Sequence, residues 1–285
     1  SVAGAYHNLG MALQYQAQAA GNKDQHALGQ FIEQALEAMQ KALQIRHAAL
    51  GPAHVDTAAS HMALAQFLSQ LQQPQAADEH YQAAADIWQE LVDNGSKRQS
   101  DNEGSSQPTK LSEQQMLTAR RHLATVYNNK GATQHGAGQG QAALEDYTKA
   151  QEALQPMFDN EQQGVPPSLM LEWAATHNNI GMAHLQLQAP ERALEAHQKA
   201  QAVLEQSVAQ HSSLLPHLRP SLAQTYGSIG KVYQAQRDYE AALAALEQAH
   251  ECLHALYADQ PHADLAASHN NLGLVHTQLQ NYEQA

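Results

Sequence analysis

Apolar and small side chains recur at helical spacing along most of the chain, with polar residues between them. Residues 176–201, THNNIGMAHLQLQAPERALEAHQKAQ, give the clearest example. The positions that share a face are His177, Ile180, Gly181 and His184 in the first half and Ala193, His197 and Ala200 in the second. Pro190 lies between the halves and would cost a backbone hydrogen bond inside a helix, so it marks a turn. The stretch predicts a helical hairpin, which cannot bury its apolar face without a neighbour of the same kind.

The same order of residues recurs along the chain. A large residue or His is followed by a polar pair, then Leu or Ile, then Gly or Ala. Later come Ala, a bulky residue four positions on, and Ala three positions further. The matches begin at Tyr6, His61, Tyr127, His177, Tyr226 and His269. Small residues let the two helices of a hairpin approach closely, and the bulky residue fills the space between them. The pattern therefore predicts an all-α chain of about six stacked hairpins, the last incomplete.

These residues resemble the tetratricopeptide repeat (TPR) family, over most of the chain. The subgroup they resemble most is kinesin light chain, whose repeats are longer, as in residues 42–65, ALQIRHAALGPAHVDTAASHMALA. Lys130 departs from the pattern, because the family has Leu there. The resemblance implies a right-handed α-solenoid superhelix of antiparallel helix hairpins that binds other proteins.

We expect residues 1–285 to form a single array. The expected repeats cover approximately 1–50, 54–93, 111–158, 169–210, 219–258 and, in part, 263–285. Other features expected from Gly, Pro and polar residues are a long turn over 18–30, a mobile loop over 94–110, and breaks over 159–168, 211–220 and 258–264. Because the chain begins and ends inside a repeat, we predict that it is a piece of a longer protein.

Composition narrows the possible functions. Hydrophobic residues make up 43% of the chain but aromatic residues only 5%, so much of the apolar content is Ala, which favours helix over sheet. The formal charge of −13 argues against a general nucleic-acid binder. The single cysteine, Cys252, permits no internal disulfide and fits a reducing compartment, so we expect a cytoplasmic protein. No apolar run is long enough to insert across a membrane.

Asparagines are the strongest candidates for binding residues. They occupy the two positions before Leu or Ile in several first helices: Asn8, Asn128, Asn129, Asn178, Asn179, Asn270 and Asn271. Asn is a poor residue for a helix interior, so its recurrence there suggests a use. The family resemblance implies that first helices line a concave face, where an asparagine ladder would bind the backbone of an extended peptide. The alternative is that these asparagines bond neighbouring helices. Weaker candidates for the rim are Tyr15, Gln66, Lys231 and Gln278.

Chemical motifs give no sign of catalysis. The sequence has no nucleophile elbow, no phosphate-binding loop and no His-Glu-x-x-His motif. The chain has 18 histidines, and His250 and His254 could share a helix face, but Cys252 between them would point elsewhere. His61, His177 and His269 stand where the family has a large ring, which favours a packing role. We therefore expect no catalytic residue, no metal site and no cofactor.

The leading hypothesis is a non-catalytic interaction module or scaffold that binds a peptide or helix of a partner protein in its concave groove. Two alternatives remain open. The chain could be a structural segment of a large assembly, self-association included. It could also be the regulatory half of an enzyme whose catalytic domain lies outside these residues.

Overall fold

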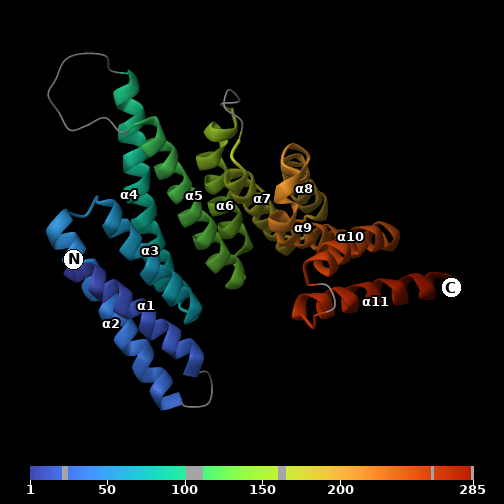
Figure 1. Ribbon diagram of the computed structural model, residues 1–285, viewed down its shortest axis with the longest axis horizontal. Coiled ribbons are helices and arrows are strands. Elements are labelled where there is room, and N and C mark those ends of the chain that lie inside the picture. The colour runs from blue at the N-terminus through green and yellow to red at the C-terminus, as the bar shows by residue number, and fades with distance from the viewer. Residues whose placement is uncertain (21–24, 101–111, 160–164, 258–259, 284–285) are drawn as a thin grey trace. The chain divides into compact units, whose positions relative to one another are not determined.

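The computed structural model describes residues 1–20, 25–100, 112–159, 165–257 and 260–283 (Figure 1). The α-helices over these residues are α1 Val2–Ala20, α2 Gln25–Leu50, α3 Val55–Gln70, α4 Pro74–Ser100, α5 Glu113–Gly136, α6 Gly140–Asp159, α7 Pro167–Gln186, α8 Pro190–Gln210, α9 Leu215–Gln236, α10 Tyr239–Tyr257 and α11 Ala263–Glu283. A short 3₁₀ turn, Ser212–Leu214, precedes α9. Over the described residues there is no strand, and the prediction of an all-α array of hairpins is confirmed.

The chain divides into two compact units, Ser1–Ala137 and Gly138–Ala285. In the first unit, α1 pairs with α2 and α3 with α4, and α5 packs on α4. An apolar cluster joins the two hairpins through Leu13, Met39, Leu64 and Phe67, together with Ala35. The first unit therefore has a core shared between hairpins, as a stacked repeat requires.

In the second unit α7 pairs with α8 and α9 with α10, while α6 packs on α7 and α11 on α10. Three apolar clusters follow one another along this unit, around Tyr147, Leu204 and Leu246. Each cluster combines residues from successive hairpins, so burial is again distributed along the unit.

The small-and-bulky pattern lies where the sequence predicts it. The bulky residues of the second helices are almost fully buried: Met39, Tyr81, Tyr147, His197 and Leu246. An added Cβ at Gly181 would lie 2.5 Å from the ring of His197, and one at Gly230 would lie 2.7 Å from Leu246 Cγ. Glycine at these positions therefore permits the close approach of the two helices of a hairpin.

Two hairpins turn in the same way. Gln72 has φ 57° and Gln188 has φ 56°, and in both hairpins the second helix then begins at a proline, Pro74 or Pro190. A proline at a helix start loses nothing, because the first N–H groups of a helix have no partner inside it. The turn predicted at Pro190 is thus confirmed.

Several helices extend into the segments expected as turns, loops or breaks. Helix α2 begins at Gln25, inside the expected turn over 18–30, of which residues 21–24 lie outside the described part. Helix α4 runs to Ser100, so only residues 101–110 of the expected loop are left, and these also lie outside the described residues. Helix α9 begins at Leu215, within the expected break over 211–220. The reason is that an existing helix gains one backbone hydrogen bond for each residue added, so polar residues at its ends extend it at little cost.

None of the described helices combines the length and apolar character that crossing a bilayer requires.

Candidate functional site

The seven candidate asparagines differ in exposure. Their exposure divides them into exposed (Asn8, Asn270), partly buried (Asn128, Asn129, Asn179, Asn271) and buried (Asn178). Only Asn271 lines one of the two pockets described below.

Asn178 takes part in helix packing. It is 3% exposed, its Nδ2 donates a hydrogen bond to Thr225 Oγ1 (2.8 Å), and its Oδ1 accepts one from His197 Nδ1 (2.9 Å). These bonds join α7 to α9 and α8. The amide nitrogen and the amide oxygen of Asn178 thus both have partners inside the protein. Asn178 therefore has the interhelical role that the sequence left open as the alternative.

A pocket of about 550 Å³ opens between α9 and α11, and we call it the first-helix groove. Its floor comes from α10, through Leu246, Ala249, Leu253 and Tyr257. The other residues that line it are Met182 of α7, Pro220, Ala223, Gln224, Gly227, Ser228 and Lys231 of α9, and Asp264, Ala267, Ser268 and Asn271 of α11. The groove therefore combines an apolar floor with a polar rim, the usual composition of a ligand site.

The rim offers both donors and acceptors. Lys231, one of the weaker sequence candidates, is exposed on α9, and Asn271 is half-buried on α11. The hydroxyl of Tyr257 donates to Asp264 Oδ2 (3.4 Å) at one end of the floor. A peptide backbone needs both a donor and an acceptor, and an asparagine amide supplies both.

Apart from Lys231, sequence reasoning missed the part that α9 plays. In α9 the two ladder positions are Gly227 and Ser228, which interrupt the run of asparagines, yet both line the groove. An added Cβ at Gly227 would meet nothing within 4 Å. A glycine in mid-helix that no neighbour requires was the signal that could have located this space.

Comparison with known proteins agrees with the repeat pattern. Sequence models of the tetratricopeptide repeat match residues 31–56, 57–96 and 221–285. Residues 31–96 and 221–285 therefore consist of tetratricopeptide repeats. No curated protein matches it.

Solved TPR structures share the fold. BtubC (BKLC) from P. vanneervenii is 19% identical, with a TM-score of 0.51 over 92% of this chain and 95% of that one. The putative kinesin light chain nearly identical TPR-like repeats of Podosopora anserina are 18% identical, with a TM-score of 0.52 over 86% of this chain and 94% of that one. The expected likeness to kinesin light chain repeats is therefore confirmed, and TPR arrays of this kind are protein-interaction scaffolds.

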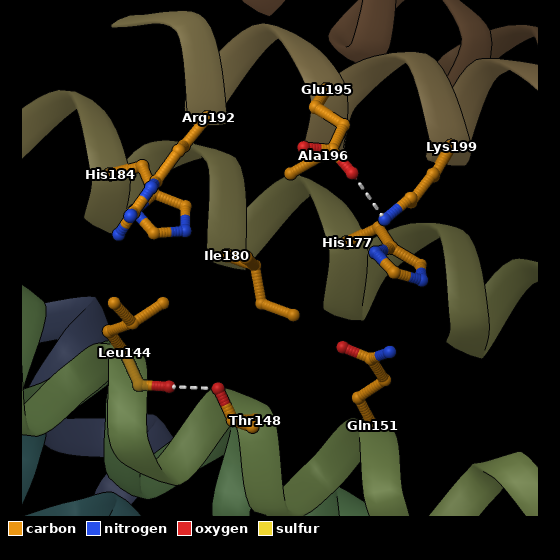
Figure 2. A pocket seen from close by; sticks show the side chains of 10 residues that line it. All are labelled: Leu144, Thr148, Gln151, His177, Ile180, His184, Arg192, Glu195, Ala196 and Lys199. Atoms are coloured by element: carbon orange, nitrogen blue, oxygen red, sulfur yellow. Dashed lines mark hydrogen bonds and ion pairs between the residues drawn. The ribbon is translucent and has the colours of Figure 1, made fainter. Parts of the chain in front are cut away.

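A second pocket is lined by α6, α7 and α8 (Figure 2). Because α6 and α8 are the second helices of their hairpins, we call it the second-helix groove. Its volume is about 400 Å³. Its lining residues are Leu144, Thr148 and Gln151 of α6, His177, Ile180 and His184 of α7, and Arg192, Glu195, Ala196 and Lys199 of α8. Figure 2 shows Arg192 with His184 at one end, Lys199 with His177 at the other, and Ile180 between them.

Several of these helices contain histidines whose rings are largely buried. Burial lowers the pKa of His177 to about 4, with a smaller effect from Lys199, and burial likewise lowers the pKa of His197 to about 4. In the first unit, burial and the neighbouring His80 lower the pKa of His61 to about 4, and the two Nδ1 atoms lie 2.9 Å apart. His177 packs edge-on against Trp173, with ring centroids 4.8 Å apart, in the packing role expected for it.

The rings of His250 and His254 lie 6.1 Å apart, and within the described part of the chain no three His, Cys, Asp or Glu side chains gather in a metal-binding arrangement.

Proposed function

We propose that this TPR array is a non-catalytic scaffold that binds an extended peptide of a partner protein in the first-helix groove. The observation that carries the proposal is the pocket itself, which combines the apolar floor of α10 with Asn271 and Lys231 on opposite walls. A groove of about 550 Å³ has room for one or two peptide side chains.

The chemistry of the groove fits a peptide. One apolar side chain would rest on Leu246 and Leu253, which water leaves readily because the floor has few polar atoms. The Asn271 amide would bond the peptide backbone, and Lys231 would select an acidic or carbonyl-rich neighbour. Since the helices that build the groove are already packed, most of the ordering cost falls on the peptide.

Gly227 provides a direct test. We would select binding peptides from a random displayed library against the unmodified protein, and then measure their affinity by fluorescence anisotropy. Gly227→Leu places a side chain into the groove from a position where an added Cβ meets nothing within 4 Å, so it should weaken the selected peptides at least tenfold. Asn271→Ala should weaken them several-fold.

Gly29→Leu in α2 is the matched control, because an added Cβ at Gly29 also meets nothing within 4 Å and the residue is far from the groove in sequence. It should leave affinity unchanged, with helicity equal in all three proteins. If the selected peptides bind Gly227→Leu as tightly as the parent, the groove is not the binding site and the proposal is wrong.

A further inference from the structure

The second-helix groove differs from the first-helix groove in the helices that build it and in its charge. We propose that it is a second docking site, which binds an acidic helical segment of a partner protein. One carboxylate would lie at each end of the groove, and an apolar side chain would lie between them on Ile180. The proposal is independent of the peptide site between α9 and α11.

Charge is the first argument. Two permanent cations, Arg192 and Lys199, line this groove in a chain whose formal charge is −13. The one carboxylate that lines it, Glu195, lies 2.8 Å from the Lys199 ammonium. That contact engages one of three N–H donors, and the Lys199 side chain is 55% exposed, so two donors stay available to a ligand. An acidic partner would therefore meet a local positive patch on an otherwise acidic protein.

Spacing is the second argument. Arg192 and Lys199 are two helical turns apart on α8, about 10 Å along the axis. A single carboxylate or an inorganic anion can reach only one end of such a site. A helix with glutamates two turns apart reproduces the separation, and a leucine one turn after the first glutamate falls between them, above Ile180. Figure 2 shows the two basic ends, with Ile180, Ala196 and Glu195 between them and the Glu195 carboxylate turned toward Lys199.

The third argument is a buried imidazole. His177 is 3% exposed, and neither of its ring nitrogens has a hydrogen-bond partner. A neutral histidine has one N–H to donate, and leaving a buried donor unpaired is destabilising. A ligand carboxylate beside Lys199 could accept that N–H. Gln151 of α6 lies across the groove from His177 and presents a further amide (Figure 2).

The test uses the full chain and a synthetic alanine-based helical peptide. The peptide carries two glutamates two turns apart and a leucine between them. Its affinity is measured by fluorescence anisotropy, and the imidazole NMR signals of His177 and His184 report contact. We expect Arg192→Gln/Lys199→Gln to bind at least tenfold more weakly than the parent. Replacing both glutamates of the peptide by glutamine should lower its affinity for the parent protein by the same factor.

Lys41→Gln/Arg237→Gln is the matched control, since it removes the same charge from positions outside the groove. Arg237 has the left-handed backbone that Gln72 and Gln188 also have, so glutamine fits there. This control and Gly227→Leu should bind the acidic peptide within twofold of the parent. His177→Phe should bind several-fold more weakly, because phenylalanine keeps the contact with Trp173 but has no N–H.

Four results would each refute a specific claim of this proposal. Equal binding of the glutamine peptide, or equal loss in the control protein, would refute recognition of acidic residues by this groove. Absence of NMR shifts at His177 and His184 with millimolar peptide would place binding elsewhere. Glutarate binding as tightly as the peptide would make the groove a small-anion site. Unchanged affinity in His177→Phe would remove the role given to the imidazole.

Discussion

The junction of α4 with α5 and the junction of α6 with α7 occupy equivalent places in successive repeats, yet their chemistry is opposite. At the first, Lys130 Nζ donates to Gln82 Oε1 (2.8 Å) and lies 3.5 Å from Asp78 Oδ1, which also accepts from Gln134 Nε2 (3.0 Å). At the second, Ile180 stands in the place of Lys130, and Leu144 in the place of Asp78.

The difference shows that the repeat fixes the shape of this junction and leaves its polarity open, provided that both partners change together. The stem of Lys130 is buried as a leucine would be, and its ammonium reaches the carboxylate opposite. Lys130 therefore departs from the sequence pattern of the family while its side chain still fills the position that leucine would occupy. At the apolar junction the shorter Ile180 and Thr148 leave the space that forms the second-helix groove.

The largest predicted change in the free energy of unfolding is a loss of stability in acid, which arises at the buried histidines of α7 and α8. His177 and His197 have folded-state pKa values of about 4, below the ordinary value of 6.5, so the unfolded state binds more protons between these values. Stability is therefore fully present above pH 6.5 and falls as the pH decreases toward 4, by about 3 kcal/mol for each histidine. Urea unfolding of the parent and of His177→Phe as a function of pH measures this. An equally steep dependence in the variant would contradict the prediction.

Gly181→Ala should cost about 2–3 kcal/mol, because the new Cβ would lie 2.5 Å from the buried His197 ring. The second repeat has Ala65 at the same position, fully buried opposite Tyr81. The requirement for glycine therefore depends on the particular ring opposite. Thermal unfolding of Gly181→Ala and of Gly181→Ala/His197→Ala tests this, since the smaller partner should make room for the added methyl group. If the two changes cost the sum of their separate effects, steric overlap is not the cause.

Asp78→Leu should cost about 2 kcal/mol, because it removes the carboxylate that lies 3.5 Å from the buried Lys130 ammonium. We place the cost below that of a fully buried ion pair, since the Asp78 side chain is 42% exposed and Lys130 keeps its bond to Gln82. Adding Lys130→Ile should restore most of the loss, since the pair then matches Leu144 and Ile180. A double-mutant cycle by urea unfolding measures the coupling. No recovery in the double variant would show that the two junctions do not share one geometry.

These junctions also explain what the sequence could predict. Spacing located the hairpins, the small positions and the turn before Pro190, because these depend on local backbone conformation and on close packing. It could not assign Asn178, because its partners His197 and Thr225 come from two other helices. It also could not locate either groove. Both depend on side chains of three or more helices. The mid-helix Gly227 was a signal of open space but not of the helices that enclose it, and Thr148 has no distinctive pattern.

Gly227→Ala should have the smallest effect and the opposite sign to Gly181→Ala. Gly227 lies in the interior of α9 with open space where its Cβ would be, so alanine removes backbone freedom from the unfolded chain without a clash. We expect a gain of about 0.5–1 kcal/mol, seen as a rise of about 1–4 °C in the midpoint of thermal unfolding. A loss of stability would mean that the first-helix groove is closed in solution. A gain would show that Gly227 is not needed for helix packing and only leaves room in the groove. Gly181, by contrast, is needed for the close contact between two helices.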